Sequence, residues 1–333
     1  MALRLLPWSP EYGTSMQFDA EAADGGEDTP GVDATIEGAW QAITPGGEPP
    51  RAVQIIDGVR RAEAHAMDDA PGGGALFGLF GSLAVGGVRL EGGRAWLLDD
   101  SFRVERRYLQ TGGEPVAHEL SSGGASLRFA AEVPSQARNA NDLVAALNRK
   151  MLEEEAKLAE QLSRDEQALT FVDGPLRLRS PGQHVVGYIK RIHNWYLDAE
   201  HQLLLPRLAV GQRTPLFRIT EAGGANERTS WFMRIADLRG HFHPLAGVLR
   251  LEVPETLPIP DAARIADQSA HALPRLASSP VRDPRSPQNL TPVGALEAAL
   301  THRLGDRRWI GRLITAAIGR ETREAREATE AHV

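Results

Sequence analysis

The sequence contains no cysteine, and this absence excludes several kinds of site at once. Without cysteine there is no disulfide framework, no thiolate metal site and no thiol nucleophile. Long apolar runs are also lacking, since no stretch approaches the roughly 18 consecutive apolar residues that span a bilayer. We therefore expect a cytoplasmic protein with no membrane partner.

The chain also lacks an excess of positive charge. It carries 37 Lys and Arg against 44 Asp and Glu, which gives a formal net charge of −7. Proteins that coat nucleic acid by overall attraction are basic, so this balance argues against that class. An enzyme that gathers carboxylates around metal ions and holds DNA through local basic groups agrees with it. No Walker A sequence is present, so any ATP-driven motion must come from a partner.

The composition divides the chain into three regions. Residues 17–34 are rich in Asp, Glu, Gly and Ala with few large hydrophobes, which is typical of an arm outside the core. We expect an N-terminal arm or extension over residues 1–50, one elaborated α/β domain over residues 51–306 and a C-terminal helical tail over residues 307–333. The tail is rich in arginine, which indicates either a contact with DNA or a partner, or a solvated helix surface with i,i+4 ion pairs.

Two short apolar runs each end in an Asp-Gly pair. Residues 53–56 precede Asp57-Gly58, and residues 170–172 precede Asp173-Gly174. A carboxylate at the carboxyl end of a buried strand lies at the sheet edge where open α/β sheets bind ligands. The glycine permits a turn and the close approach of a phosphate backbone. A single Asp-Gly pair is a common turn, but two after apolar runs predict a pair of functional carboxylates.

A helix predicted over residues 143–162 offers a third acid. At about 100° per residue its leucines share one face, and Glu154 falls within that stripe. Glu155 lies just outside the stripe, where a ligand reaches a cleft more easily, and Glu153 points away. A carboxylate on an apolar face is costly unless it is paired, neutralised or bound to metal. Angle favours Glu154, Glu155 stays close behind, and a solvated acidic patch is the alternative to a metal site.

A fourth acid is expected from a later helix over residues 262–273, in which Asp267 follows Ile265 and Ala266. A surface aspartate there is the ordinary alternative. Together with the earlier acids, Asp267 would complete a set of hard oxygen ligands for Mg²⁺ or Mn²⁺. Two such ions roughly 3.5–4 Å apart clamp the attacking and leaving oxygens in phosphodiester hydrolysis, and their mutual repulsion requires several carboxylates.

These motifs resemble those of the NurA nucleases, in the same order along the chain, over about residues 50 to 306. The matching stretches are VQIIDG (53–58), the acidic helix, FVDGPL (171–176), GYIKR (187–191), RDPRSPQNL (282–290), Leu296-Glu297 and RLGD (303–306). Each Asp-Gly motif is weak by itself, but the order of the motifs and the proline-rich tail make the match fairly specific.

The resemblance implies a fold, an activity and partners. It implies an α/β fold with a ribonuclease-H-like mixed sheet flanked by helices, with elaborations, and Mn²⁺- or Mg²⁺-dependent exo- and endonuclease activity. It also implies a homodimer that works with the HerA hexameric ATPase in DNA end resection or phage defence. Carried over by position, Asp57, Asp173 and a helix glutamate, Glu154 or Glu155, become metal ligands. Family members often have a late histidine ligand, and in the region where we expect it this chain has Asp267.

Two basic residues are candidate DNA contacts. Lys190 would contact a phosphate as a point charge, and Arg60 follows the first acid closely enough to steer the scissile phosphate; a strand-edge lysine and a solvated arginine are the alternatives. The sequence thus predicts a metal-dependent DNA nuclease. The alternatives are a catalytically weak adaptor that threads DNA for a motor ATPase, and another ribonuclease-H-like nuclease such as a junction resolvase or RNA-strand nuclease.

Overall fold

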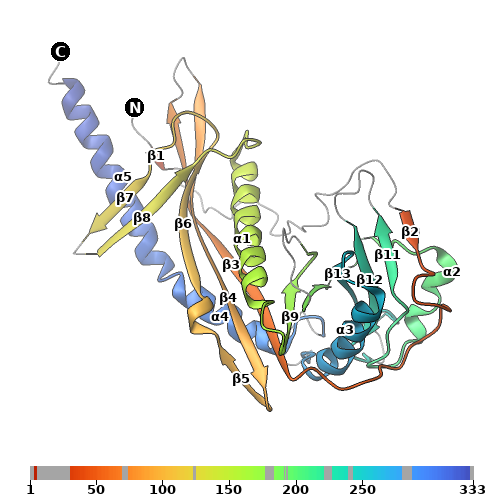
Figure 1. Cartoon of the computed structure of the whole chain (residues 1–333). Helices are drawn as coiled ribbons and strands as arrows, with labels where there is room; N and C mark the ends of the chain where they lie inside the picture. Colours follow the sequence, from red (N-terminus) through yellow and green to blue (C-terminus); the bar gives the residue numbers. More distant parts are fainter. Residues whose placement is uncertain are drawn as a thin grey trace.

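A long mixed β-sheet organises the protein, with helices packed on both of its faces (Figure 1). The computed structural model describes residues 4–5, 31–69, 74–122, 125–176, 184–190, 192, 194–220, 227–238, 243–279 and 287–330. Most of the predicted arm, residues 6–30, and part of the proline-rich stretch, residues 280–286, lie outside these ranges. Within them, no helix is both long and apolar enough to cross a membrane.

The elements follow one another along the chain in a strand-rich half and a half that alternates strands with helices. The strands are β1 (Arg4–Leu5), β2 (Gly31–Asp33), β3 (Ala52–Asp69), β4 (Ala75–Glu91), β5 (Arg94–Leu97), β6 (Arg103–Gln110), β7 (His118–Ser122), β8 (Ala125–Glu132), β9 (Ala168–Asp173), β10 (Val185–Ile189), β11 (Phe217–Thr220), β12 (Arg228–Arg234) and β13 (Val248–Pro254). The α-helices are α1 (Ala140–Leu162), α2 (Ala199–Gln202), α3 (Ile259–Ala272), α4 (Thr291–Arg303) and α5 (Arg307–Glu330).

The sheet has the order β2-β11-β12-β13-β10-β9-β3-β4-β6-β8-β7, with β1 added to β3 and β5 to β4. Its centre is β6-β4-β3-β9-β10. There β3, β4 and β6 form an antiparallel meander, β9 runs parallel to β3, and β10 runs parallel to β9. Numbered by chain order, these five strands lie as 3-2-1-4-5, with α1 connecting the third to the fourth. This is a ribonuclease-H-like core, and it confirms the predicted α/β fold class; the outer strands are elaborations.

The first Asp-Gly pair does not end its strand, which corrects the sequence prediction. β3 continues through Gly58 to Asp69, because β4 pairs with it along this whole length. The second pair does end its strand: β9 stops at Asp173, and Gly174 has a φ of +85°. Beyond Asp173, β3 therefore no longer has β9 as a neighbour on one side, but it remains paired with β4 on the other.

Alternate residues of β3 pack on opposite faces of the sheet. Ile55 belongs to the hydrophobic cluster that contains Ile265 of α3 and Leu296 of α4. Its neighbour Ile56 belongs to the cluster that contains Leu158 of α1. Helix α1 thus covers one face, and helices α3 and α4 cover the other.

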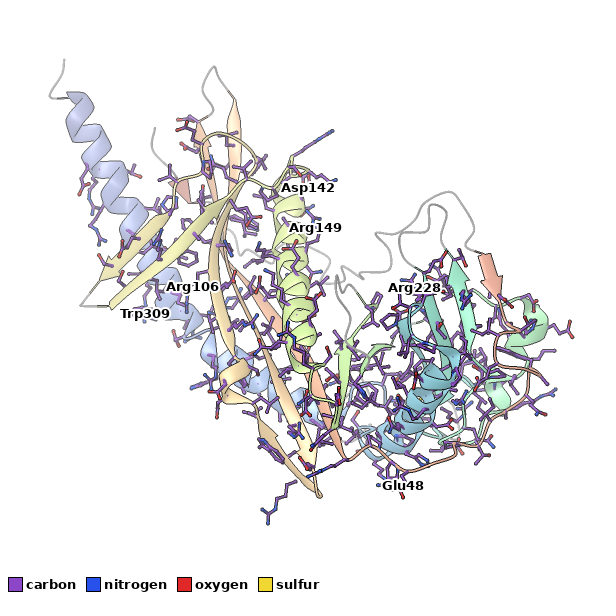
Figure 2. The ribbon with its side chains drawn as sticks, viewed as in Figure 1. Glu48, Arg106, Asp142, Arg149, Arg228 and Trp309 are labelled. Atoms are coloured by element: carbon purple, nitrogen blue, oxygen red, sulfur yellow. The ribbon has the colours of Figure 1, made fainter. Side chains whose placement is uncertain are left out.

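The helix ends differ in detail from the sequence prediction. Helix α1 begins at Ala140, three residues before the predicted start, with a capping box between Asn139 and Asp142; Asp142 is labelled at this end of the helix in Figure 2. Helix α5 runs on to Glu330, and its Ile310 and Ile314 pack in a second core with residues of β4, β6, β7 and β8. It lies along that end of the sheet in Figure 1.

Candidate active site

Asp57 and Asp173 are neighbours on adjacent parallel strands. The register of β3 and β9 pairs Ile56 with Val172, so the next residue on each strand is the aspartate. Since paired residues of parallel strands share a face, both carboxylates project on the α3–α4 side of the sheet. Asp57 is 6% exposed, whereas the Asp173 side chain is 32% exposed. One buried acid and one accessible acid therefore stand side by side where β9 ends.

Helix α1 adds Glu155 to this pair. Glu155 is 3% exposed, and its carboxylate lies against the backbone of Gly58, where a side chain would overlap it. It is close enough to Asp57 and Asp173 for their charges to raise its pKa. The glycine of the first Asp-Gly pair therefore serves to admit a helix carboxylate, in place of the turn expected from the sequence.

Glu154 is also buried, as its helical angle predicted, but it has other partners. Its carboxylate accepts a hydrogen bond from Lys157 and lies 3.9 Å from the Arg103 guanidinium. The structure thus places Glu155, and not Glu154, with the two aspartates. The helical wheel correctly predicted a buried Glu154 and an exposed Glu153. It placed Glu155 just outside the buried stripe, although Glu155 is 3% exposed, and it did not show which neighbour each side chain contacts.

The fourth acid expected from the sequence, Asp267, lies elsewhere. Its carboxylate accepts a hydrogen bond from Arg213 at 2.7 Å and another from the backbone N–H of Gly46 at 3.0 Å. Arg213 also binds Glu37, so this buried arginine ties the segment after β2 to helix α3. Asp267 is therefore an ion-pair partner of Arg213, and its placement among the metal ligands is corrected.

Glu297 of α4 is the fourth acid of the cluster, and its role was not predicted from the sequence. Its charge contributes to the raised pKa of Asp57 and acts on Tyr188 and Lys190 as well. A signal was present: Glu297 follows Val293 by four residues and precedes Leu300 by three, and both of these are fully buried. A carboxylate at that spacing lies at the edge of the buried helix face.

Burial and mutual repulsion strongly favour the protonated acids. Burial, followed by the charges of Asp173 and Glu297, raises the pKa of Asp57 to about 8, against the smaller opposing effects of Lys190 and the Gly58 N–H. Burial, followed by Asp57 and Asp173, raises the pKa of Glu155 well above its ordinary value. Such a site has a high affinity for positive charge.

Lys190 supplies one positive charge to this site from the end of β10. Its ammonium donates to Asp173 Oδ2 at 2.7 Å and to Asn289 Oδ1 at 3.1 Å, and it lies 5.3 Å from the centre of the Tyr188 ring. Burial opposes its charge, but Asp173, Asp57 and Glu297 outweigh this effect and raise the pKa of Lys190. Asn289, which is 1% exposed, was not assigned from the sequence.

The other candidate DNA contact, Arg60, lies on the α1 face of β3. Its guanidinium Nε donates to Asn148 Oδ1 of α1 at 2.9 Å. Alternation along β3 places Arg60 on the same face as Gly58, against which the Glu155 carboxylate packs. Arg60 is thus held beside α1, two residues beyond the position that receives Glu155.

The donor set suits a hard divalent cation. Asp57 Oδ2 is buried and has no hydrogen-bond partner among the described residues, so an oxygen lone pair is left unsatisfied in the interior. Carboxylate and amide oxygens are the ligands preferred by Mg²⁺ and Mn²⁺. As the side chains stand, no three Asp, Glu or His residues in the described part of the chain converge closely enough to hold an ion. The Lys190 ammonium lies beside Asp173 and offsets part of the negative charge of the cluster.

The fold and site define an α/β protein that gathers carboxylates at the end of a ribonuclease-H-like sheet. A sequence model of the NurA domain matches residues 76–296, about two thirds of the chain, and the chain belongs to the NurA family. This confirms the resemblance found in the motifs. Among solved structures, it is similar to the NurA nuclease from Sulfolobus solfataricus, with a TM-score of 0.45 and 10% identity over 85% of this chain and 88% of that one. The comparison with curated proteins gave no match.

Proposed function

We propose that this protein is a divalent-metal-dependent nuclease that hydrolyses phosphodiester bonds of DNA, by exo- and endonucleolytic cleavage. Membership of the NurA family supports a nuclease. The observation that carries the chemistry is the group formed by Asp57, Asp173, Glu155 and Glu297. Burial, followed by the charges of Asp173 and Glu297, raises the pKa of Asp57 to about 8, and burial, followed by the charges of Asp57 and Asp173, raises the pKa of Glu155. A protein keeps so unfavourable a group of acids where a positively charged ligand stabilises it.

The cation would be Mn²⁺ or Mg²⁺, and two ions are in keeping with four carboxylates. Asp57, Glu155 and Asp173 would hold it, and Glu297 would be the fourth acid, in place of the Asp267 predicted from the sequence. A cation of this kind polarises a phosphoryl oxygen and makes an attacking water easier to deprotonate. Asp57 and Glu155 are buried, whereas Asp173 is 32% exposed, so a substrate would approach the ion from the side of Asp173.

Two basic groups would place the DNA backbone. Lys190 is the only lysine that the structure describes within hydrogen-bonding distance of an acid of this cluster, and its partner Asp173 is the most accessible of the three predicted ligands. A compact ammonium on a flexible stem suits a phosphate oxygen. Arg60 would contact the backbone farther along the α1 face, where Asn148 fixes its guanidinium.

A motor partner and a second copy complete the proposal. The chain has no Walker A sequence, so translocation along DNA would come from a HerA-type hexameric ATPase, and we expect a homodimer on the basis of the family resemblance. Such an assembly would act in DNA end resection or in phage defence. The net charge of −7 of the chain agrees with DNA that is delivered to the site by a partner and held there by local contacts.

Cleavage of end-labelled linear DNA tests the proposal. Wild type should cut with Mn²⁺ or Mg²⁺ and not with a chelator, and Asp57→Ala should abolish cutting. Asp267→Asn is the matched control, because this acid pairs with Arg213 away from the cluster; it should retain metal-dependent cutting. If folded wild type leaves single- and double-stranded DNA intact with either metal, and still does so with the ATPase added, the nuclease proposal is wrong.

One observation favours a second candidate, a DNA-threading adaptor with weak catalysis. Lys190 already neutralises Asp173, and no closed group of metal ligands is formed by the described side chains. Titration of Mn²⁺ by calorimetry separates the candidates: a nuclease should show a divalent site that disappears in Asp57→Ala, and an adaptor should show none. Cleavage of duplex, flap, junction and RNA–DNA hybrid substrates then distinguishes other nucleases of this fold.

A further inference from the structure

The Lys190 ammonium and a divalent cation compete for the same carboxylate. Lys190 donates to Asp173 Oδ2 at 2.7 Å, and its ammonium also donates to Asn289 Oδ1 at 3.1 Å. A bound Mg²⁺ or Mn²⁺ would lie about 2.1 Å from the same carboxylate. Because two cations at such a separation repel strongly in a partly buried site, the ion and the ammonium cannot both occupy it.

The acids that act on Lys190 come from four elements. Asp173 lies on β9, Asp57 on β3 and Glu297 on α4, and all three stabilise the ammonium. Glu155 of α1 is also within electrostatic reach of it. The ammonium is therefore the internal counter-ion of the whole cluster.

Once displaced, the ammonium needs another negatively charged partner. Its side chain is 20% exposed, and the ammonium is carried on a flexible four-carbon stem. Asn289 offers an uncharged amide oxygen, which cannot replace the charge of Asp173. Since the ion would take its position at Asp173, the scissile phosphate would lie beside the same carboxylate, within reach of the lysine stem.

We propose that Lys190 is a built-in counter-ion that a divalent cation displaces from Asp173, and that the displaced ammonium then binds a DNA phosphate. The inference deepens the proposed nuclease function and rests on it. It implies that metal and DNA each strengthen the binding of the other. The metal ion frees the ammonium to bind phosphate, and the phosphate keeps the ammonium away from Asp173. It also assigns Lys190 two partners in turn, Asp173 without the metal and phosphate with it.

Calorimetric titration with Mn²⁺ tests the first half of the inference. Lys190→Gln removes the competing charge and keeps a polar side chain, so its affinity for Mn²⁺ should exceed that of wild type by about tenfold or more. Lys150→Gln is the matched control, because Lys150 pairs with Glu132 and Glu153 outside the cluster; its affinity should equal that of wild type. Equal affinities for wild type and folded Lys190→Gln, or no divalent binding in either, would overturn the inference.

Binding of a fluorescent oligonucleotide, with Ca²⁺ or with chelator, tests the second half. In wild type the divalent ion should tighten DNA binding about tenfold more than it does in Lys190→Gln, and Lys190→Arg should restore part of this linkage because it keeps the charge. The same metal-dependent gain in wild type and Lys190→Gln would refute the transfer to phosphate. Neither readout depends on cleavage. If wild type binds metal and DNA with the expected linkage but does not cut, the counter-ion inference stands and the proposed activity fails.

Discussion

Replacing Asp57 by asparagine tests the electrostatic account of the site independently of catalysis. Asp57 is 6% exposed, and burial, followed by the charges of Asp173 and Glu297, raises its pKa to about 8. Asparagine has nearly the same shape and no charge. In the metal-free protein the variant should therefore be more stable than wild type at alkaline pH, although the mutation removes a residue from the proposed active site.

The sign follows from the two pKa values of Asp57. Below about pH 4 the carboxyl is protonated in both folded and unfolded chains, so its ionisation does not affect stability. Between about pH 4 and pH 8 the unfolded chain releases the proton and the folded chain retains it, so the free energy of unfolding falls as pH rises. Above about pH 8 both states are ionised, and the loss is complete.

The magnitude is bounded by the same values. A tenfold change in proton affinity corresponds to about 1.4 kcal/mol, so the rise from 3.8 to about 8 sets an upper limit of about 6 kcal/mol. Water entry and side-chain rearrangement around the ionised acid will reduce this. We expect the difference in the free energy of unfolding between Asp57→Asn and wild type to grow by on the order of 2 kcal/mol, in favour of the variant, from pH 5 to pH 8.

Urea denaturation with chelator, at unit steps from pH 5 to pH 9, measures the difference. The gap between Asp57→Asn and wild type should widen with pH and level off above pH 8, and Mn²⁺ should stabilise wild type more than the variant. Asp267→Asn is the control of opposite sign, because it breaks the contact with Arg213 and should be less stable than wild type throughout. A difference that stays constant or shrinks with rising pH would refute the reasoning.

Other substitutions test the membership of the site. Glu155→Gln should reduce metal-dependent cleavage by more than about 100-fold, whereas Glu154→Gln should leave it near wild type and cost on the order of 1 kcal/mol of stability; equal losses of activity would contradict the placement. Glu297→Gln should weaken Mn²⁺ binding by about 10- to 100-fold in calorimetry, and an unchanged affinity would remove it from the site. Gly58→Ala should lower stability by about 1–3 kcal/mol in thermal unfolding, because its Cβ overlaps the Glu155 carboxylate; an unchanged melting temperature would refute that contact.

The pairing of Asp57 with Asp173 could be predicted from the sequence because it depends on local patterns. Each aspartate follows an apolar run, and neighbouring strands in parallel bring such positions together. The sequence did not show that β3 continues past Gly58. Residues 59–69 carry many charged and small side chains, and only their pairing with β4 makes them a strand. The length of β3 depends on its pairing with β4, so the sequence of β3 alone does not predict where the strand ends.

The choice between Glu154 and Glu155 shows a different limit. Both side chains are buried, at 5% and 3% exposure, because α1 contacts the sheet over a broad strip. Periodicity along one helix predicts which residues are buried but carries no information on the opposing surface. Glu154 meets Arg103 of β6 and Glu155 meets Gly58 of β3, and these partners are far apart in sequence. Asp267 was misplaced for the same reason, since its partner Arg213 has no local signal.

The site depends on the end of β9, because β9 stops at Asp173 and the neighbouring β3 continues to Asp69. Glu155 comes from α1 on one face and Glu297 from α4 on the other, and an intact sheet between them would keep their charges apart. Because β9 ends at Asp173 while β3 continues, carboxylates from both faces act on the same end of the sheet. This arrangement brings four negative charges together with one lysine to offset them. Occupancy of the site by a cation is therefore coupled to the stability of this end of the sheet, so metal binding should protect the backbone amides around Gly174 from hydrogen exchange more than those of β12.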